Sequence, residues 1–129
     1  MATTVLGLVL STATEAPPRE LAELGRLAED KGFAAVLVNE GRGDALACAQ
    51  AIAAATSRIQ VGTNIANIYY RHPFLAAMTA ATVAELSGGR LVLGLGSNHR
   101  QLLAAQVITT QSPRDDLRAY VQRDKQILA

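Results

Sequence analysis

The sequence predicts an α/β fold with a parallel sheet, because short apolar runs alternate with longer segments of helical periodicity. The apolar runs cover residues 5–10, 33–38, 59–63 and 91–95. Runs of this length and continuity are typical of strands that are buried on both faces. Strands that alternate with helices indicate right-handed crossovers and therefore a parallel sheet. Alanine-rich helical segments such as AIAAAT suit close packing of helices on this sheet.

The ends of the first two helices are marked by residues typical of helix caps. Residues 17–18 are both proline, which the first helical turn tolerates because a missing N–H costs little there. The helix that follows is expected to end at Lys31 and Gly32, with the cation near the negative end and the glycine in a left-handed conformation. Asp44 is expected to cap a second helix that reaches Ala55.

The second half of the chain gives helix signals of unequal strength. A helix is predicted over residues 73–86, where a proline opens it and the glycines of the turn Ser87–Arg90 end it. Residues 98–105 fit a short helix, whereas residues 107–111 fit either a brief strand or a loop. Residues 112–115 (Ser-Pro-Arg-Asp) match a capping box and predict the start of a last helix.

Composition and charge argue against several classes of function. The net charge of the 129 residues is +1 and no basic stripe is present, so a nucleic-acid partner is not expected. No apolar run approaches the roughly 18 residues that indicate a membrane span, and no signal peptide is recognised. The single cysteine, Cys48, excludes an internal disulfide and fits a cytoplasmic location. The histidines and acids show no spacing typical of metal ligands.

Polar and glycine residues follow three of the predicted strands, where parallel α/β folds place their functional sites. Asn39 and Glu40 follow the second strand, and both a ligand contact and an ordinary solvated loop are open interpretations there. Residues 64–67 (Asn-Ile-Ala-Asn) follow the third strand. The fourth strand ends in residues 94–99 (Gly-Leu-Gly-Ser-Asn-His), where glycine lets a ligand approach the backbone closely.

Two motifs give the chain a resemblance to a known family. Arg71-His72-Pro73 opens the third helix, and Ser87-Gly88-Gly89-Arg90 leads into the strand that ends in Gly-Leu-Gly-Ser. With the segment around them, they resemble the luciferase-like monooxygenase superfamily, the flavin- and deazaflavin-dependent oxidoreductases built on a TIM barrel. The resemblance runs from Val5 to about Gly96 and returns, more weakly, near residues 112–121. It implies a partial TIM barrel, a (βα)₄-type half barrel with parallel strands in a single domain over residues 1–129, since a complete barrel takes about 250 residues.

The resemblance also implies the residues of the site. It gives catalytic roles to His99 and Glu40, and a histidine side chain exchanges protons near neutral pH. A surface histidine on a helix is an equal alternative for His99, and Gly41 stands where many relatives place a histidine or an aromatic residue after the acid. A cis peptide bond is implied between Asn64 and Ile65. The residues implied to bind the cofactor are Asn39, Asn64, Ile65, Ala66, Gly96, Ser97 and Asn98.

The implied chemistry is oxidoreduction of a small-molecule substrate, with 8-hydroxy-5-deazaflavin coenzyme or FMN as the cofactor. The stretch GLGSNHRQL favours the deazaflavin branch. A half barrel leaves open strand edges and an uncovered apolar lining, so the expected partner is a second copy or the missing second half of the barrel. Weak turnover by this chain alone is expected, because loose positioning of a cofactor ring costs on the order of 100-fold in rate.

Two alternatives remain open at this point. One is a non-catalytic paralogue that only binds flavin or forms oligomers. The other is a flavodoxin-like domain of unrelated function. Strand order separates the two folds, because a half barrel requires the sequential order 1-2-3-4, whereas the order 2-1-3-4 indicates a doubly wound sheet.

Overall fold

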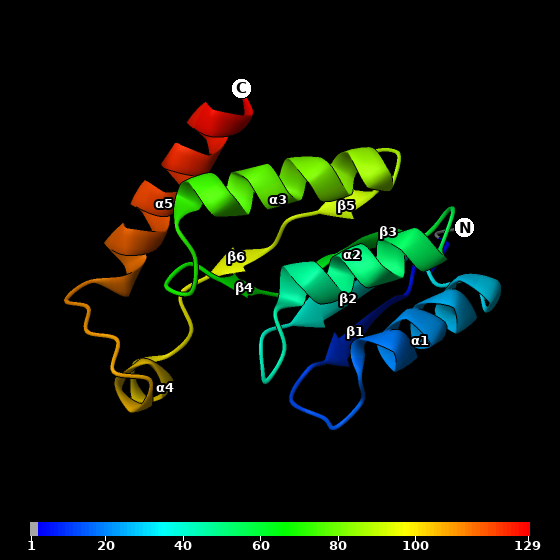
Figure 1. The fold of residues 1–129 in the computed structure, drawn as a ribbon, viewed down its shortest axis with the longest axis horizontal. Coiled ribbons are helices and arrows are strands. Elements are labelled where there is room, and N and C mark those ends of the chain that lie inside the picture. Colours follow the sequence, from blue (N-terminus) through cyan, green and yellow to red (C-terminus); the bar gives the residue numbers. More distant parts are fainter. Residues whose placement is uncertain (1–2) are drawn as a thin grey trace.

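In the computed structural model, which describes residues 3–129, helices lie along one side of a parallel sheet (Figure 1). None of the helices in these residues is long and apolar enough to cross a lipid bilayer. The order of elements follows the alternation that the sequence predicts. The elements are β1 (Gly7–Ser11), α1 (Pro18–Asp30), β2 (Ala35–Asn39), α2 (Ala45–Ala55), β3 (Gln60–Thr63), β4 (Ala66–Asn67), α3 (Pro73–Leu86), β5 (Leu91–Val92), β6 (Leu95–Gly96), α4 (Arg100–Ala105) and α5 (Pro113–Leu128).

The larger sheet within residues 3–129 contains β1, β2, β3 and β5 in that order, all parallel, and β4 pairs with β6 in a second parallel sheet. Because β5 and β6 together occupy the predicted fourth strand, this arrangement confirms the expected order 1-2-3-4. It excludes the doubly wound alternative, in which the first strand lies between the second and the third. The first strand begins later than predicted, because Gly7 is the residue that pairs with Ala35 at the start of β2.

The third strand ends at Thr63, as predicted, whereas the predicted fourth strand is divided between β5 and β6. The break lies at residues 93–94, beside the end of β3. The Thr63 hydroxyl donates to the Gly94 carbonyl at 2.8 Å and accepts the Gly94 N–H at 3.0 Å. A side chain thus replaces main-chain pairing at this point. A Cβ on residue 94 would lie 2.1 Å from the Thr63 carbonyl oxygen, so the close approach requires glycine.

The residues predicted to cap helices do so in the structure. Gly32 follows α1 with a φ of 81°, and Gly88 and Gly89 follow α3 with φ of 65° and 82°. The Asp44 carboxylate accepts the N–H groups two and three residues later, at 2.9 and 3.1 Å. The Ser112 hydroxyl accepts the N–H three residues later and begins α5. These local patterns therefore set the helix ends that position the loops around the site.

The hydrophobic core lies between the sheet and the helices α1, α2 and α3. Val36, Val38 and Val61 point from β2 and β3 toward the helices and are fully buried. Leu21 from α1 and Ile52 from α2 pack in the same cluster. The alternation of side chains along a strand therefore directs the neighbouring strand residues to the opposite face of the sheet.

That opposite face carries apolar side chains that stay accessible to solvent. Val9, Leu37, Gly62 and Val92 form one register row across the larger sheet. Val9 and Val92 are exposed, and Leu37 is half-buried. In a TIM barrel, residues in such rows fill the interior in layers. We call this row the lining row, and it has the composition expected of the inside of a barrel.

Glu29, near the end of α1, holds the amino end of β3. Its carboxylate accepts the N–H groups of Ser57, Arg58 and Ile59 at 3.0, 2.7 and 2.9 Å. These hydrogen bonds, that from Ile59 most strongly, lower the pKa of Glu29 from 4.5 to about 2 against the opposing effect of burial. The ionised carboxylate therefore stabilises the loop before β3 at neutral pH.

Arg90 joins three segments at the same end of the sheet. Its guanidinium donates to the carbonyls of Ala53 and Thr56 at 3.0 Å each, to that of Ile59 at 2.8 Å and to that of Ser87 at 2.6 Å. It also donates to the Thr56 hydroxyl at 3.0 Å. Because the last carbonyls of a helix have no partner within the helix, Arg90 completes the end of α2.

The helix α5 packs against α3 and buries Asp124. Neither carboxylate oxygen of Asp124 has a hydrogen-bond partner among residues 3–129. Burial raises the pKa of Asp124 above its ordinary value, and burial together with Asp124 raises the pKa of Tyr120 to about 12. The Tyr120 hydroxyl donates to the carbonyl of Arg71 at 2.9 Å and so ties α5 to the start of α3.

Candidate functional site

The residues predicted to bind the cofactor come from three neighbouring strand ends. Asn39 ends β2, Asn64 and Ile65 link β3 to β4, and Gly96 ends β6. The N–H of Asn64 donates to the carbonyl of Val38 at 2.8 Å, which keeps the exits of β2 and β3 side by side. Since parallel strands end at the same edge of a sheet, the structure brings these segments to one edge (Figure 1).

Ile65 and Gly96 lie against each other where β4 pairs with β6. A Cβ on residue 96 would lie 2.8 Å from Cγ1 of Ile65, so the Ile65 side chain covers Gly96. The peptide bond between Asn64 and Ile65 is cis, as the resemblance implied. Asn64 is exposed and Ile65 is partly buried. This part of the edge therefore presents one amide and one apolar side chain.

Asn98 and His99 follow β6 and begin α4. Asn98 has a φ of 60°, in the left-handed region that asparagine tolerates. His99 is the N-cap of α4, and its Nδ1 accepts the N–H of Leu102 at 3.3 Å. The neutral ring therefore carries its proton on Nε2. His99 is exposed, so a capping role coexists with the predicted role in proton transfer, which stays a prediction.

Glu40 lies one residue beyond β2 and is buried among polar groups, with its side chain 4% exposed. Its Oε2 accepts the N–H of Ala45 at 2.8 Å, and its Oε1 accepts the N–H of Asn67 at 3.0 Å. The same Oε1 forms an ion pair with Arg71. Both oxygens are thus engaged by the protein, and the predicted catalytic role of Glu40 stays a prediction.

Arg71 precedes α3 and is almost as buried as Glu40, with its side chain 7% exposed. Its Nη1 also donates to the Asn67 carbonyl at 3.3 Å, and its Nη2 lies 3.4 Å from Oδ1 of Asp44. Arg71 is thus paired with the carboxylates of Glu40 and Asp44. His72, the next residue, caps α3 by accepting the N–H of Phe74 on Nδ1.

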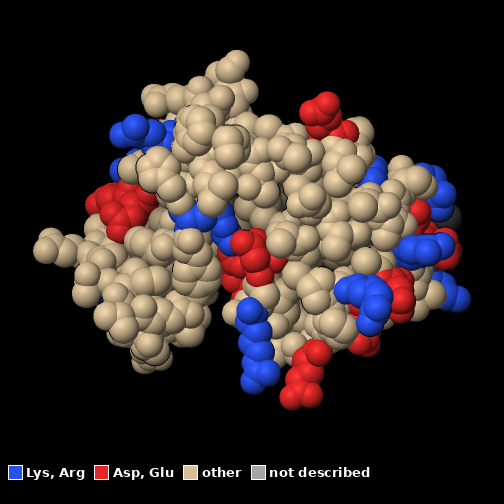
Figure 2. Space-filling model, viewed as in Figure 1, with Lys and Arg blue, Asp and Glu red and all other residues tan. Residues whose placement is uncertain are grey.

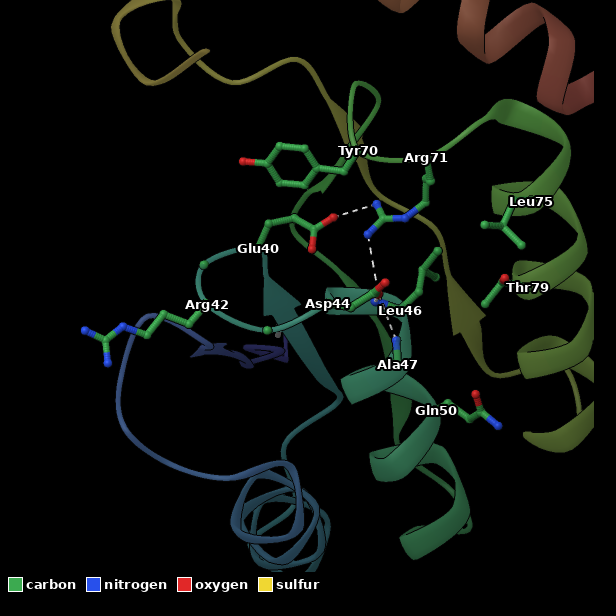
Figure 3. A pocket seen from close by; sticks show the side chains of 12 residues that line it. Glu40, Arg42, Asp44, Leu46, Ala47, Gln50, Tyr70, Arg71, Leu75 and Thr79 are labelled. Atoms are coloured by element: carbon green, nitrogen blue, oxygen red, sulfur yellow. Dashed lines mark hydrogen bonds and ion pairs between the residues drawn. The ribbon is translucent and has the colours of Figure 1, made fainter. Parts of the chain in front are cut away.

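A cavity of about 480 Å³ lies beside this ion pair, between the segments that precede α2 and α3. Figure 3 shows that Glu40, Arg71 and Asp44 turn toward one another at its wall, whereas Arg42 points away. Polar and apolar side chains share the lining. The lining residues are Glu40, Gly41, Arg42, Gly43, Asp44, Leu46, Ala47, Gln50, Tyr70, Arg71, Leu75 and Thr79.

The edge at the strand ends offers neutral amides beside small residues. The amides of Asn39, Asn64 and Asn98 both donate and accept hydrogen bonds. Asn39 already accepts the N–H of Thr12 on Oδ1 at 3.2 Å, which leaves its amide nitrogen as a donor. These groups fit the rim of a flavin or deazaflavin ring, which carries carbonyl and N–H groups. The donor set is therefore compatible with the cofactor that the resemblance implies.

Three residues that were not predicted from the sequence organise this region. Thr63 interrupts the strand pairing, and Tyr120 ties α5 to the segment before α3. Asn67 is fully buried; its Oδ1 accepts the N–H of Tyr69 at 2.9 Å, and its amide nitrogen has no partner among residues 3–129. The contacts of Thr63 and Tyr120 join residues far apart in sequence, so no local pattern of residues marks them.

Curated relatives match the chain over part of their length. A predicted coenzyme F420-dependent oxidoreductase of Mycobacterium tuberculosis is 39% identical over 99 residues, which cover 76% of this chain and 28% of the relative. A 5,10-methylenetetrahydromethanopterin reductase of Methanolobus tindarius is 30% identical over 99 residues, covering 75% of this chain and 30% of the relative. The chain thus spans about 30% of the length of these relatives.

Solved structures show the same fold. The coenzyme F420-dependent tetrahydromethanopterin reductase of Methanopyrus kandleri matches 98% of this chain and 40% of its own, with a TM-score of 0.78 and 23% identity. The oxygenating constituent of 3,6-diketocamphane monooxygenase of Pseudomonas putida, in complex with FMN, matches 97% of this chain and 40% of its own, with a TM-score of 0.81 and 16% identity. The partial coverage supports a partial TIM barrel. The model of the luciferase-like monooxygenase family matches residues 2–123, and the chain belongs to that family.

Proposed function

We propose that the protein is a cofactor-dependent oxidoreductase that acts on a small-molecule substrate. The observation that carries the proposal is the edge at which the exits of β2, β3 and β6 meet, with Asn39, Asn64 and Asn98 beside small residues. Family membership supports the reaction class. The bound cofactor supplies hydride transfer or oxygen activation, and the protein orients its ring and shields it from water.

The cofactor that we favour is 8-hydroxy-5-deazaflavin coenzyme, with FMN as the second candidate. The relatives at 39% and 30% identity support the first choice, since one has coenzyme F420 in its name and the other is a reductase of the same class as the F420-dependent structure. The FMN complex, at 16% identity, shares the fold alone. Asn39, Asn64, Ile65 and Ala66 and residues 96–98 hold the ring in this proposal, and His99 exchanges a proton with the substrate.

The solvent-accessible lining row lowers the activity that we expect of this chain alone. In the similar structures the matched segment covers about 40% of the chain, so further strands complete the barrel there. We expect the 129-residue chain to bind its cofactor weakly and to turn over slowly, and we expect the second barrel half, added in trans, to restore activity. The free Cys48 fits a reducing compartment and so a cytoplasmic location.

Replacing Asn64 with alanine tests the placement of the cofactor. The expected result is about a tenfold rise in the Kd of the deazaflavin, since one exposed hydrogen-bonding group is lost. Titration of the purified chain with each cofactor, followed by fluorescence, measures this change. Gln60→Ala is the matched control, because Gln60 is an exposed amide at the start of β3, whereas Asn64 follows the end of that strand. Equal effects of the two variants would show that the site is misplaced.

We also propose that two copies of the chain associate through α2 and α3. The helix α2 has no charged residue and α3 has only Glu85. Figure 2 shows that uncharged residues cover much of this face, with one group of charged atoms near the centre of the view and the others toward the margins. Phe74, Leu75 and Met78 on α3 are exposed. A helix that is apolar on all sides is typically buried, which supports a covering partner.

Replacing Met78 with glutamate is expected to shift the chain from dimer to monomer in light scattering, because a charge at this face loses its hydration on association. Leu27→Glu on α1 is the matched control, since Met78 and Leu27 are each 51% exposed. The control is expected to leave the mass unchanged. A monomeric wild-type chain at high concentration would contradict the proposed association.

A further inference from the structure

The ion pair between Glu40 and Arg71 binds both main-chain polar groups of Asn67 at the candidate site. Glu40 accepts the N–H of Asn67, and Arg71 donates to the carbonyl of the same residue. Two oppositely charged side chains from different strand exits therefore grip the last residue of β4. Both side chains are more than nine-tenths buried, so water competes little for these contacts.

The same pair connects β4 to the starts of α2 and α3. Glu40 accepts the N–H of Ala45, the first residue of α2, and Arg71 lies close to Asp44, the cap of that helix. Arg71 itself stands just before α3, and its carbonyl accepts the hydroxyl of Tyr120. One buried pair thus joins the exits of β2 and β4 to three helices.

The position of Asn67 sets the position of the segment predicted to touch the cofactor. Ala66 donates its N–H to the Gly94 carbonyl at 2.8 Å, and Ile68 donates its N–H to the Gly96 carbonyl at 3.0 Å. Asn67 lies between these two bonds, and its N–H and its carbonyl bind Glu40 and Arg71. The anchor lies three residues after Asn64, so movement of Asn67 is transmitted to the edge that carries Asn64 and Ile65.

We propose that Glu40 and Arg71 are positioning residues, which fix β4 and thereby the edge that receives the cofactor ring. The proposal rests on the proposed function, and it gives Glu40 a task other than proton transfer. Both oxygens of Glu40 accept main-chain N–H groups, and Oε1 is also paired with Arg71, so the protein itself engages the whole carboxylate. A group that exchanges protons in catalysis must instead reach the substrate.

The test compares Glu40→Gln with Glu29→Gln in the 129-residue chain. Glu29 is the matched control, because its carboxylate also accepts main-chain N–H groups but lies at the amino end of β3. Hydrogen exchange of the cofactor-free proteins is expected to be about tenfold faster at residues 65–68 in Glu40→Gln, and unchanged there in Glu29→Gln. Unchanged exchange at residues 65–68 in Glu40→Gln would overturn the proposal.

Arg71→Lys provides a second variant in case Glu40→Gln fails to fold. Lysine keeps the positive charge beside Glu40 but has one nitrogen, so it cannot serve Glu40, Asp44 and the Asn67 carbonyl together. The expected result is the same faster exchange at residues 65–68, in a chain that retains its fold. Exchange equal to that of the wild type would count against the anchor.

Cofactor titration separates positioning from proton transfer. In a positioning role, Glu40→Gln raises the Kd of the deazaflavin about tenfold and leaves the shape of the pH–rate profile unchanged. A lost limb of the pH profile with an unchanged Kd would show that Glu40 is the catalytic group and overturn the proposal. If the wild-type chain binds neither cofactor, the proposed function fails, while the exchange data still decide whether the pair anchors β4.

Discussion

Replacing Arg90 with methionine is expected to lower the free energy of unfolding by about 3 kcal/mol, because the variant leaves several main-chain carbonyls without a donor. The guanidinium serves the end of α2, the loop before β3 and the turn after α3. Methionine keeps much of the length of the side chain and removes its donors. Urea denaturation followed by circular dichroism measures the change.

The control for Arg90 is Arg26→Met on the exposed side of α1. Substitutions at exposed sites away from special contacts usually change stability by less than about 0.5 kcal/mol. If the Arg90 variant were as stable as this control, the carbonyls at the end of α2 would have found other partners, and the anchoring role of Arg90 would be refuted. The turn Ser87–Arg90 would then matter for its glycines alone.

Replacing Asp124 with leucine is expected to raise the free energy of unfolding at pH 7 by about 1–3 kcal/mol, because it removes two buried oxygens that have no partner among residues 3–129. Denaturant titrations at pH 3 and pH 7 measure the effect. Asp124→Asn is the second variant, since it keeps the shape of the side chain and removes its charge.

The pH dependence follows from the raised pKa of Asp124 in the folded chain. Below the unfolded pKa of 3.8 both states hold the proton, and ionisation costs the fold nothing. As the pH rises past that value, the unfolded chain ionises first, and the wild type loses stability until the folded pKa is passed. The gain from leucine should therefore grow between pH 3 and pH 7. A wild type that is more stable than both variants at pH 7 would show that Asp124 is paired in solution.

Much of the fold can be predicted from the sequence because its signals are local. Asp44, Gly32 and the glycines before Arg90 mark helix ends through their own backbone preferences, and apolar runs mark the strands. The family resemblance supplied the strand order and the cis bond between Asn64 and Ile65, which composition and periodicity do not indicate.

The contacts that organise the site join residues far apart in the sequence. Thr63 replaces strand pairing by bonding to Gly94, and Glu40 reaches Asn67 and Arg71 from a different strand exit. Each contact depends on which strands become neighbours and on the register in which they pair. A threonine in an apolar run or an acid in a loop has no property in the sequence alone that indicates such a partner.

The sequential order of the strands has a consequence for how the chain folds during synthesis. Each strand of the larger sheet pairs with the preceding strand of that sheet, as Gly7 with Ala35 and Ala35 with Gln60. Such pairings between near neighbours in sequence close short loops, which favours fast assembly. Within residues 3–129 the sheet can therefore grow one strand at a time, from β1 to β5.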